Sequence, residues 1–467
     1  MHKPDALPSS AAAPEASQHT HPIDAAVRVL RAPATIRERC ASITAAVTSG
    51  ESPHFTVDRS KLAAVADRVA RLTHTRYPDL AIPYHSRWRH FEAGGLDRKD
   101  ELDRRLEGCS VEVVTRARID LTMVSVLLDA GAGRQWRYIE PFSIDLTATP
   151  YARSEGLAAA TFRAFVQGRF SSDEDDPCRV DAKALMRLDA HAIAAIFGAS
   201  EKNPLIGIDG RAQLMRRLGE ALHAQSQWFG PEGRPGMMFD ALAANETTHV
   251  TSDSASRTVT AAQILGLLLD AFSTIWPSGQ SLQVADQVRA IGDVWPHPHA
   301  GGQGMSAGLV PFHKLSQWLT YSLLEPFEWA GVRVDGLDAL TGLPEYRNGG
   351  LLLDAGVIVP RDARQHASVK SAVKGAAKGA AKVLVKASMS APMTVSDPWI
   401  VEWRALTVAL LDELAPLVRG ILGVHASALP LACILEGGTW AAGRAIAAEL
   451  RPGGVPPITV ESDGTVF

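Results

Sequence analysis

Hydrophobic positions along most of the chain recur at steps of three and four residues, which is the spacing of one face of an α-helix. Leu62, Val65, Val69 and Leu72 follow this spacing, and leucines repeat it at 214, 218 and 222 and at 406, 410 and 414. The segment Val111–Leu128 differs because it is rich in β-branched residues and is separated by glycines from Trp136–Ile139. We therefore predict a mostly α-helical protein with one β-hairpin or small sheet near Val111–Ile139.

Two segments depart from this helical pattern. Residues 1–21 are mostly Ala, Pro and Ser, a composition that predicts a disordered tail. A low-complexity insert at about 365–396 carries lysines at every fourth position from Lys370 to Lys386. On a helix these lysines would form a cationic stripe suited to a membrane surface or an anionic partner. Gly375 and Gly379 disfavour that helix by about 1 kcal/mol each, which favours a peripheral, solvated insert. The remaining chain, 22–467, is predicted to form a single mostly helical domain.

Composition excludes several classes of protein. The formal net charge is −4 and 46% of the residues are hydrophobic, so we expect a globular protein with no nucleic-acid partner. No apolar run approaches the roughly 20 residues of a membrane helix, and we expect no membrane partner. The four scattered cysteines indicate neither a disulfide framework nor a zinc site. Because the chain shows no secretory signal, the expected location is the cytoplasm. The oligomeric state stays open.

Several specific stretches together resemble the uracil-catabolism protein family of fungi and bacteria. They include PYHSRWRHFEAGG at 83–95, DVWPHPH at 293–299, LTGLPEYRNGGL at 340–351 and LEGGTWAAGR at 435–444. The resemblance extends from Pro22 to Phe467. That family accompanies a cyclohydrolase-like ring-opening enzyme and a uracil phosphoribosyltransferase, so the resemblance implies a role in uracil degradation.

A more distant resemblance implies a fold and a reaction. The order of RSEGLAAATFRAF, NPLIGIDGRAQLMRRLGEAL, VPFHKLSQWL and LTGLPEYRNGGLLLDAGVI is similar to that of the queuosine-salvage N-glycosidases. Those enzymes cut the bond between a base and ribose 5-phosphate, and their helical fold is related to that of helix-hairpin-helix DNA glycosylases. The resemblance places the family's lysine on Lys314 and its acidic residue on Glu345. This chain has Glu where that family has Asp.

Lys314 and Glu345 are therefore the candidate catalytic residues. Cleavage of an N-glycosidic bond passes through a sugar cation and needs a nearby carboxylate, a positioned water and a proton for the leaving nitrogen. Glu345 suits the first task, although a helix N-cap or a salt bridge to Arg347 would equally explain it. Lys314 would bind a 5-phosphate or hold Glu345 in its ionised form; the alternative is a solvated surface lysine. We predict that both side chains meet in one pocket, with Asp293 and His297 on its rim.

Further residues are candidates for substrate binding. They are Arg153, which can clamp a phosphate, Glu155, Tyr346 and Arg347, together with Asp293 and His297, which would contact ribose hydroxyls or the leaving group. A structural histidine in a Pro-rich turn is the alternative for His297. His297 and His299 form an HxH pair that can bind a metal, but no third ligand has diagnostic spacing, so we predict neither a metal nor a cofactor.

Two further motifs have competing interpretations. Arg87, Arg89 and His90 form a cationic cluster that either holds an anionic group or is ordinary surface charge. Glu402–Arg404 and Glu436–Trp440 are expected to be mainly structural, as buried ion pairs and a Gly-Gly turn.

These observations favour a hydrolase with a small ribosyl substrate. The leading hypothesis is cleavage of ribosylurea or its 5-phosphate to release urea within uracil breakdown. One alternative is an amidohydrolase or isomerase that acts on the opened pyrimidine with help from a metal. Another is a scaffold or DNA-binding protein that is not an enzyme, although a sequence pI near 6.4 argues against DNA binding.

Overall fold

The computed structural model describes residues 21–140, 150–244, 257–277, 279–361 and 393–461. Residues 1–20 of the predicted tail and residues 365–392 of the predicted insert lie outside these ranges. Within them the prediction of a mostly α-helical fold is confirmed. None of the helices in the described ranges is long and apolar enough to cross a bilayer.

Nearly all the regular elements in the first half of the described chain are helices. Its helices are α1 (Pro22–Arg31), α2 (Pro33–Ser49), α3 (Leu62–Arg76), α4 (Trp88–Phe91), α5 (Arg98–Arg105), α6 (Val111–Leu127), α7 (Arg153–Val166), α8 (Ala182–Leu185), α9 (Ala190–Ile196), α10 (Ile208–Ala224), α11 (Ser226–Phe229) and α12 (Met238–Ala244). Short 3₁₀ turns lie at Arg59–Lys61, Ala93–Gly95 and Pro235–Met237. The helices predicted from leucine and valine spacing correspond to α3 and α10.

Further helices lie in the second half of the described chain. They are α13 (Ala261–Phe272), α14 (Lys314–Trp329), α15 (Tyr346–Asp354), α17 (Pro398–Leu422), α18 (Leu431–Ile434) and α19 (Trp440–Leu450), with a π-helical turn at Leu435–Thr439 between the last two. Further 3₁₀ turns lie at Gly304–Ser306, Leu337–Ala339 and Pro452–Gly454. The third predicted helix corresponds to α17, which begins at an Asp397 N-cap followed by Pro398.

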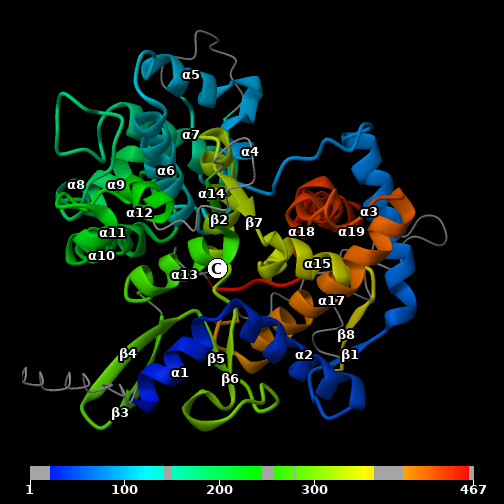
Figure 1. Cartoon of the computed structure of the whole chain (residues 1–467). Helices are drawn as coiled ribbons and strands as arrows, with labels where there is room; N and C mark the ends of the chain where they lie inside the picture. The colour runs from blue at the N-terminus through cyan, green and yellow to red at the C-terminus, as the bar shows by residue number, and fades with distance from the viewer. Residues whose placement is uncertain (1–20, 141–149, 245–256, 278, 362–392, 462–467) are drawn as a thin grey trace, which may run out of the picture.

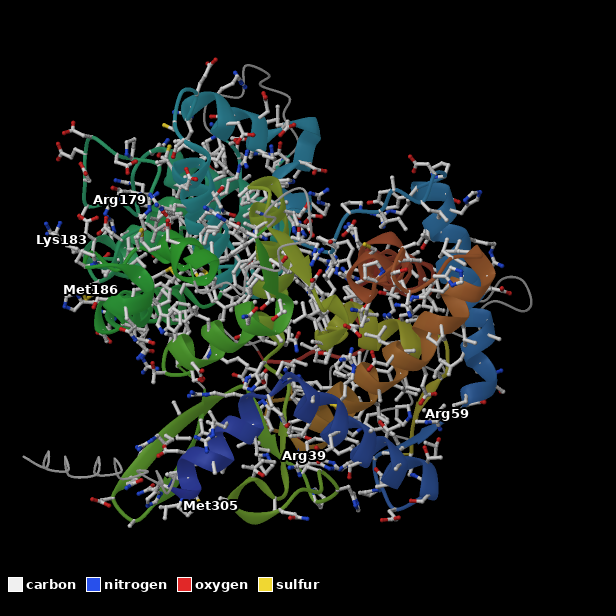
Figure 2. The ribbon with its side chains drawn as sticks, in the orientation of Figure 1. Arg39, Arg59, Arg179, Lys183, Met186 and Met305 are labelled. Atoms are coloured by element: carbon white, nitrogen blue, oxygen red, sulfur yellow. The ribbon has the colours of Figure 1, made fainter. Side chains whose placement is uncertain are left out.

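Within the described ranges, the strands form only two-stranded pairs. The strands are β1 (Phe55–Val57), β2 (Thr258–Thr260), β3 (Gln280–Val284), β4 (Gln287–Gly292), β5 (Val294–Pro296), β6 (Leu309–Pro311), β7 (Arg333–Asp335) and β8 (Ile358–Pro360). β1 pairs with β8, β3 with β4 and β5 with β6, all antiparallel, whereas β2 and β7 are parallel. The loop between β5 and β6 is held to α2 by the buried Arg39, whose guanidinium donates to the carbonyl of Ala300 at 3.4 Å (Figure 2).

The predicted hairpin near Val111–Ile139 is wrong, because Val111–Leu127 is helix α6. The side chain of Ser110 caps this helix by accepting from the N–H of Val113 at 3.4 Å. Nearly all of its second half is buried, and burial on every side overrides the modest β-preference of its valines and threonines. Only an isolated bridge, Tyr138 to Tyr151, is β-like in this part of the described chain.

One large hydrophobic core joins both halves of the molecule. Helix α14 runs through its centre and is buried at every residue from Leu315 to Phe327. It packs against α6 and α13, while α17 packs against α2 and α3, and α15 against α17 and α19. Figure 1 shows the green helices α8 to α12 on one side of α14 and the blue and orange helices α3, α17 and α19 on the other. The first turns of α14 and α15 therefore lie between the two groups.

Candidate functional site

A cavity of about 270 Å³ opens where the two helical groups meet, and we call it the central cavity. Its lining residues come from the start of α14 and α15, the segment after α6, the start of α7, the region of α4, the start of α19 and the chain at 455–460. Those that carry the argument are His85, His90, Asp129, Arg134, Arg153, Lys314, Trp318, Glu345, Tyr346 and Trp440. Lys314 and Glu345, 31 positions apart in the sequence, thus line one cavity.

Glu345 has a structural role in addition to lining the cavity. It is the N-cap of α15: its Oε2 accepts from the N–H of Arg347 at 2.7 Å and its Oε1 from that of Asn348 at 2.6 Å. The capping role that the sequence left open as an alternative is therefore correct. Because each carboxylate oxygen has a second lone pair, capping leaves acceptor capacity for a ligand.

Burial shifts the pKa values of both Glu345 and Lys314. Burial raises the pKa of Glu345, and it outweighs the opposing effects of the two backbone N–H groups and of Lys314. Burial also lowers the pKa of Lys314, against the charges of Glu345 and Asp129. The charge of Lys314 favours the ionised form of Glu345 but does not outweigh the effect of burial on its pKa. A carboxyl group with a raised pKa in a cavity is suited to proton exchange.

Lys314 begins α14, where a cation is unfavourable for the helix dipole. The preceding residue, His313, has a left-handed conformation with φ 47° and is the N-cap. The backbone N–H of Lys314 donates to Oδ2 of Asp293 at 3.0 Å, which fixes the first turn. Lys314 is also among the residues that line the central cavity.

Asp293 does not lie on the rim of the central cavity, so that part of the prediction is wrong. It is buried and forms a two-pronged pair with Arg404, at 2.9 and 2.7 Å, and accepts from the indole N–H of Trp295 at 2.7 Å. Burial acts to raise the pKa of Asp293, but the charge and hydrogen bonds of Arg404, with those of Trp295 and Lys314, outweigh it and hold the pKa at about 2. Asp293 is a buried anchor for the start of α14.

His297 is also outside the lining of the central cavity, which corrects the second rim residue. Its Nδ1 accepts from the N–H of His299 at 3.2 Å, and its Nε2 lies 3.3 Å from Oε2 of Glu402. Ser52 donates to the other oxygen of Glu402 at 2.5 Å. The structural alternative for His297 is therefore the one observed. Each ring nitrogen of His297 thus has a protein group beside it. Among the residues described, no three His, Cys, Asp or Glu side chains are grouped to hold a metal ion.

Of the remaining residues predicted to bind substrate, some line the central cavity and others do not. Arg153 and Tyr346 line the central cavity. Glu155 instead pairs with Arg444 at 3.3 Å. Arg347 lies over the ring of Tyr346, 5.0 Å from its centroid, and donates to the carbonyl of Gly454 at 3.1 Å. Neither Glu155 nor Arg347 is among the residues that line the cavity.

Sequence reasoning missed Asp129, His85, Trp318 and Trp440. Oδ2 of Asp129 pairs with the fully buried Arg87 at 3.1 Å, whereas its Oδ1 is buried with no hydrogen-bond partner in the described ranges. Nδ1 of His90 and Nε1 of Trp318 are orphaned in the same way. Such groups are costly unless a ligand or water satisfies them. Asp129 has one sequence signal: it ends an apolar helix and precedes the Gly-rich run AGAG.

His90 is held in its neutral form. Burial, together with the positive charge of Arg87, lowers the pKa of His90 to about 3. Its imidazole therefore offers the cavity one N–H and one free lone pair across the physiological range.

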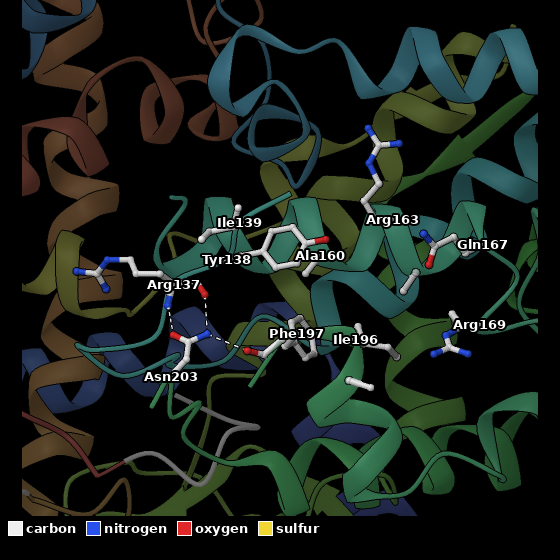
Figure 3. Close-up of a pocket in the computed structure, with 13 residues that line it drawn as sticks. Arg137, Tyr138, Ile139, Ala160, Arg163, Gln167, Arg169, Ile196, Phe197 and Asn203 are labelled. Carbon is white, nitrogen blue, oxygen red and sulfur yellow. Dashed lines mark hydrogen bonds between the residues drawn. The ribbon is translucent and has the colours of Figure 1, made fainter. Parts of the chain in front are cut away.

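Two other cavities lack these features. One of about 330 Å³ is lined by Arg137, Tyr138, Arg163 and Asn203 (Figure 3). Its polar groups serve the fold: Asn203 bonds the backbone of Arg137, and Arg163 pairs with Glu101 and Glu140. A wider cleft of about 1010 Å³ passes Tyr84. None of the described residues that line either one has an orphaned buried polar side-chain atom.

Known proteins resemble this chain along most of its length. "Uracil catabolism protein 4" of Lachancea kluyveri is 37% identical over 431 residues, which cover 90% of this chain and 93% of that protein. "Protein urg3" of Schizosaccharomyces pombe is 37% identical over 440 residues, which cover 92% and 96% respectively. The resemblance to the uracil-catabolism proteins is therefore confirmed. A family model described as "Protein of unknown function (DUF1688)" matches residues 29–467, and the chain belongs to this family.

Proposed function

We propose that this protein is a hydrolase of uracil degradation that cleaves the bond between ribose and urea in ribosylurea or its 5-phosphate. The pathway follows from the relative named as a uracil catabolism protein, which matches over nearly the whole chain. The observation that carries the reaction is that Glu345 and Lys314, matched to the catalytic pair of N-glycosidases, line one cavity with Asp129.

The chemistry needs negative charge beside the anomeric carbon. As the carbon–nitrogen bond breaks, its electron pair leaves with the urea nitrogen and positive charge develops on the sugar. Carboxylates of Glu345 and Asp129 stabilise that charge best because they are fixed in place before the reaction. Water then bonds to the anomeric carbon and gives a proton to one of these carboxylates. The products are ribose, or its phosphate, and urea.

The cavity also suits recognition of such a substrate. The rings of Trp318, Tyr346 and Trp440 give it apolar walls, and the orphaned Oδ1 of Asp129 and Nε1 of Trp318 offer an acceptor and a donor. Lys314, Arg134 and Arg153 carry three positive charges in the lining against two carboxylates. This balance favours the phosphorylated substrate.

Substitution of Glu345 tests the proposal. We expect Glu345→Gln to lower kcat for urea release by about 10²-fold or more with little change in KM, because it removes charge needed mainly in the transition state. Activity of the wild type should fall as the pH drops through the raised pKa of Glu345, since the acid form lacks this charge. This acidic limb should be absent from the residual activity of Glu345→Gln. Release of urea from the substrate is the measurement.

Three further variants make the result interpretable. Glu345→Asp keeps a good N-cap and a carboxylate, so it should retain more activity than Glu345→Gln at similar stability. Lys314→Met should impair both kcat and KM. Glu413→Gln alters an exposed carboxylate that pairs with Arg59 and should behave as wild type. Unchanged turnover in folded Glu345→Gln would exclude a catalytic role and favour a scaffold.

A further inference from the structure

We propose that His85 is the proton donor to the departing urea nitrogen and that Glu436 is its positioning residue. This inference deepens the proposed function and rests on it. His85 lines the central cavity with Glu345 and Lys314, and the residue is only 5% exposed.

The hydrogen bonds of His85 leave one ring nitrogen for the substrate. Its Nδ1 lies 3.0 Å from Oε2 of Glu436, and its backbone N–H donates to the carbonyl of Ala432 at 3.0 Å. A carboxylate can only accept, so Nδ1 carries a proton. Nε2 has no hydrogen-bond partner within the described ranges. A histidine fixed at one nitrogen by a carboxylate is the usual arrangement for a proton-transfer group.

Glu436 is held from the opposite side. Its Oε1 accepts from Nη2 of Arg76 at 2.9 Å and from the hydroxyl of Tyr77 at 3.3 Å. Burial acts to raise the pKa of Glu436, but the hydrogen bond and charge of His85 and the charge of Arg76 outweigh it, so the pKa is lowered. Glu436 is therefore a carboxylate at neutral pH and stabilises a positive charge on His85.

The backbone around Glu436 is unusual for a structural ion pair. Residues Leu435–Thr439 form a π-helical turn instead of the predicted Gly-Gly turn, and such turns are frequent at functional sites. A Cβ at Gly438 would lie 2.5 Å from Oγ1 of Thr73, so glycine is required for this close approach to α3. That approach brings Glu436 next to Arg76.

Charged and titratable groups from several elements surround His85. Glu436 lies on the π-helical turn, Arg76 and Tyr77 at the end of α3, His90 on α4 and Glu345 at the start of α15. His90 shares the cavity but is neutral, so it has no proton to spare as an acid. His85 is the histidine of this pair that a carboxylate supports.

The step balances in protons and electrons. Protonated His85 transfers the proton on Nε2 to the urea nitrogen as that nitrogen takes the electron pair of the broken bond. The attacking water bonds to the anomeric carbon and loses its proton to Glu345 or Asp129. Solvent returns that proton to His85 after urea leaves.

Two substrates with different leaving groups test this role. Urea needs a proton to depart, whereas 4-nitrophenolate does not, so a proton donor matters only for the first. We expect His85→Gln to lower kcat for ribosylurea by about 10²-fold or more and to change cleavage of 4-nitrophenyl β-D-ribofuranoside by less than about 5-fold. Glu345→Gln should impair both reactions. His297→Gln, remote from the cavity, is the matched control.

The pH profile with ribosylurea is an independent readout. Wild-type activity should show a loss at alkaline pH that His85→Gln lacks, and in Glu436→Gln this alkaline limb should lie at lower pH. Wild-type protein that releases no urea overturns the proposed function. Wild-type protein that does, with His85→Gln keeping the alkaline limb or equally impaired on both substrates, overturns only the role of His85.

Discussion

Two histidine–glutamate pairs in this molecule share their chemistry and differ in their surroundings. His85 and Glu436 border the central cavity, with Nε2 of the histidine left for a ligand. His297 and Glu402 lie outside its lining, and both nitrogens of that histidine face protein groups. Residue type therefore does not separate a reactive histidine from a structural one. The contacts of the second ring nitrogen do.

Two aspartate–arginine pairs repeat this contrast. Both oxygens of Asp293 are engaged by Arg404, and one also accepts from Trp295. Asp129 pairs with Arg87 through one oxygen and has no partner for the other in the described ranges. A saturated polar cluster stabilises a fold, whereas an incompletely satisfied one at a cavity is suited to a ligand.

Substitution in the saturated cluster should have the largest effect on stability. We expect Asp293→Ala to destabilise the fold by about 3–5 kcal/mol, because it leaves the charge of Arg404 buried and uncompensated. The pKa of Asp293 is lowered, so its stabilisation is present above the unfolded pKa and is lost as the pH falls toward about 2. Thermal unfolding at several pH values measures both effects. If Asp293→Ala is as stable as the wild type but has a raised KM, Asp293 contacts the substrate and its role is not mainly structural.

Substitution of Glu402 and of Glu436, the glutamates of the two histidine–glutamate pairs, should have a smaller effect on stability and tests the difference between the pairs. We expect Glu402→Gln to cost about 1–2 kcal/mol of stability, because it weakens the bond from the buried Ser52, and to leave the pH–rate profile unchanged. Glu436→Gln should alter that profile. Guanidinium unfolding measures the loss of stability in each variant, and steady-state kinetics at several pH values measure its pH–rate profile. If Glu402→Gln and Glu436→Gln have identical pH–rate profiles, the two histidine–glutamate pairs do not differ in function.

The smallest effect is expected at Glu155, one of the residues predicted to bind substrate. Its contact with Arg444 is partly exposed, and such pairs contribute about 0–1 kcal/mol. Glu155→Gln should therefore change neither the melting temperature nor KM appreciably. Steady-state kinetics decide the matter, since a tenfold rise in KM would mean that Glu155 contacts the substrate after all.

The sequence predicted the features that depend on local spacing. Helices α3, α10 and α17 have amphipathic repeats, and the order of motifs placed Lys314 and Glu345 together. Helix α6 was mistaken for strands because it is rich in β-branched residues and because its burial is a property of the whole fold. His85 and Glu436 are 351 positions apart, so no local pattern reveals that they meet. Asp293 and His297 are residue types that could bind a substrate. Only their partners far along the chain, Arg404 and Glu402, show that these polar groups already contact the protein itself.

Product identification is the most direct test of the account. Purified wild-type protein, incubated with ribosylurea and separately with its 5-phosphate, should form urea and the free sugar in a 1:1 ratio without ammonia. The rates of formation of both products should fall in parallel in Glu345→Gln and be unchanged in Glu413→Gln. Ammonia in place of urea would show cleavage of the amide and contradict an N-glycosidase, and no product from either substrate would contradict the reaction itself.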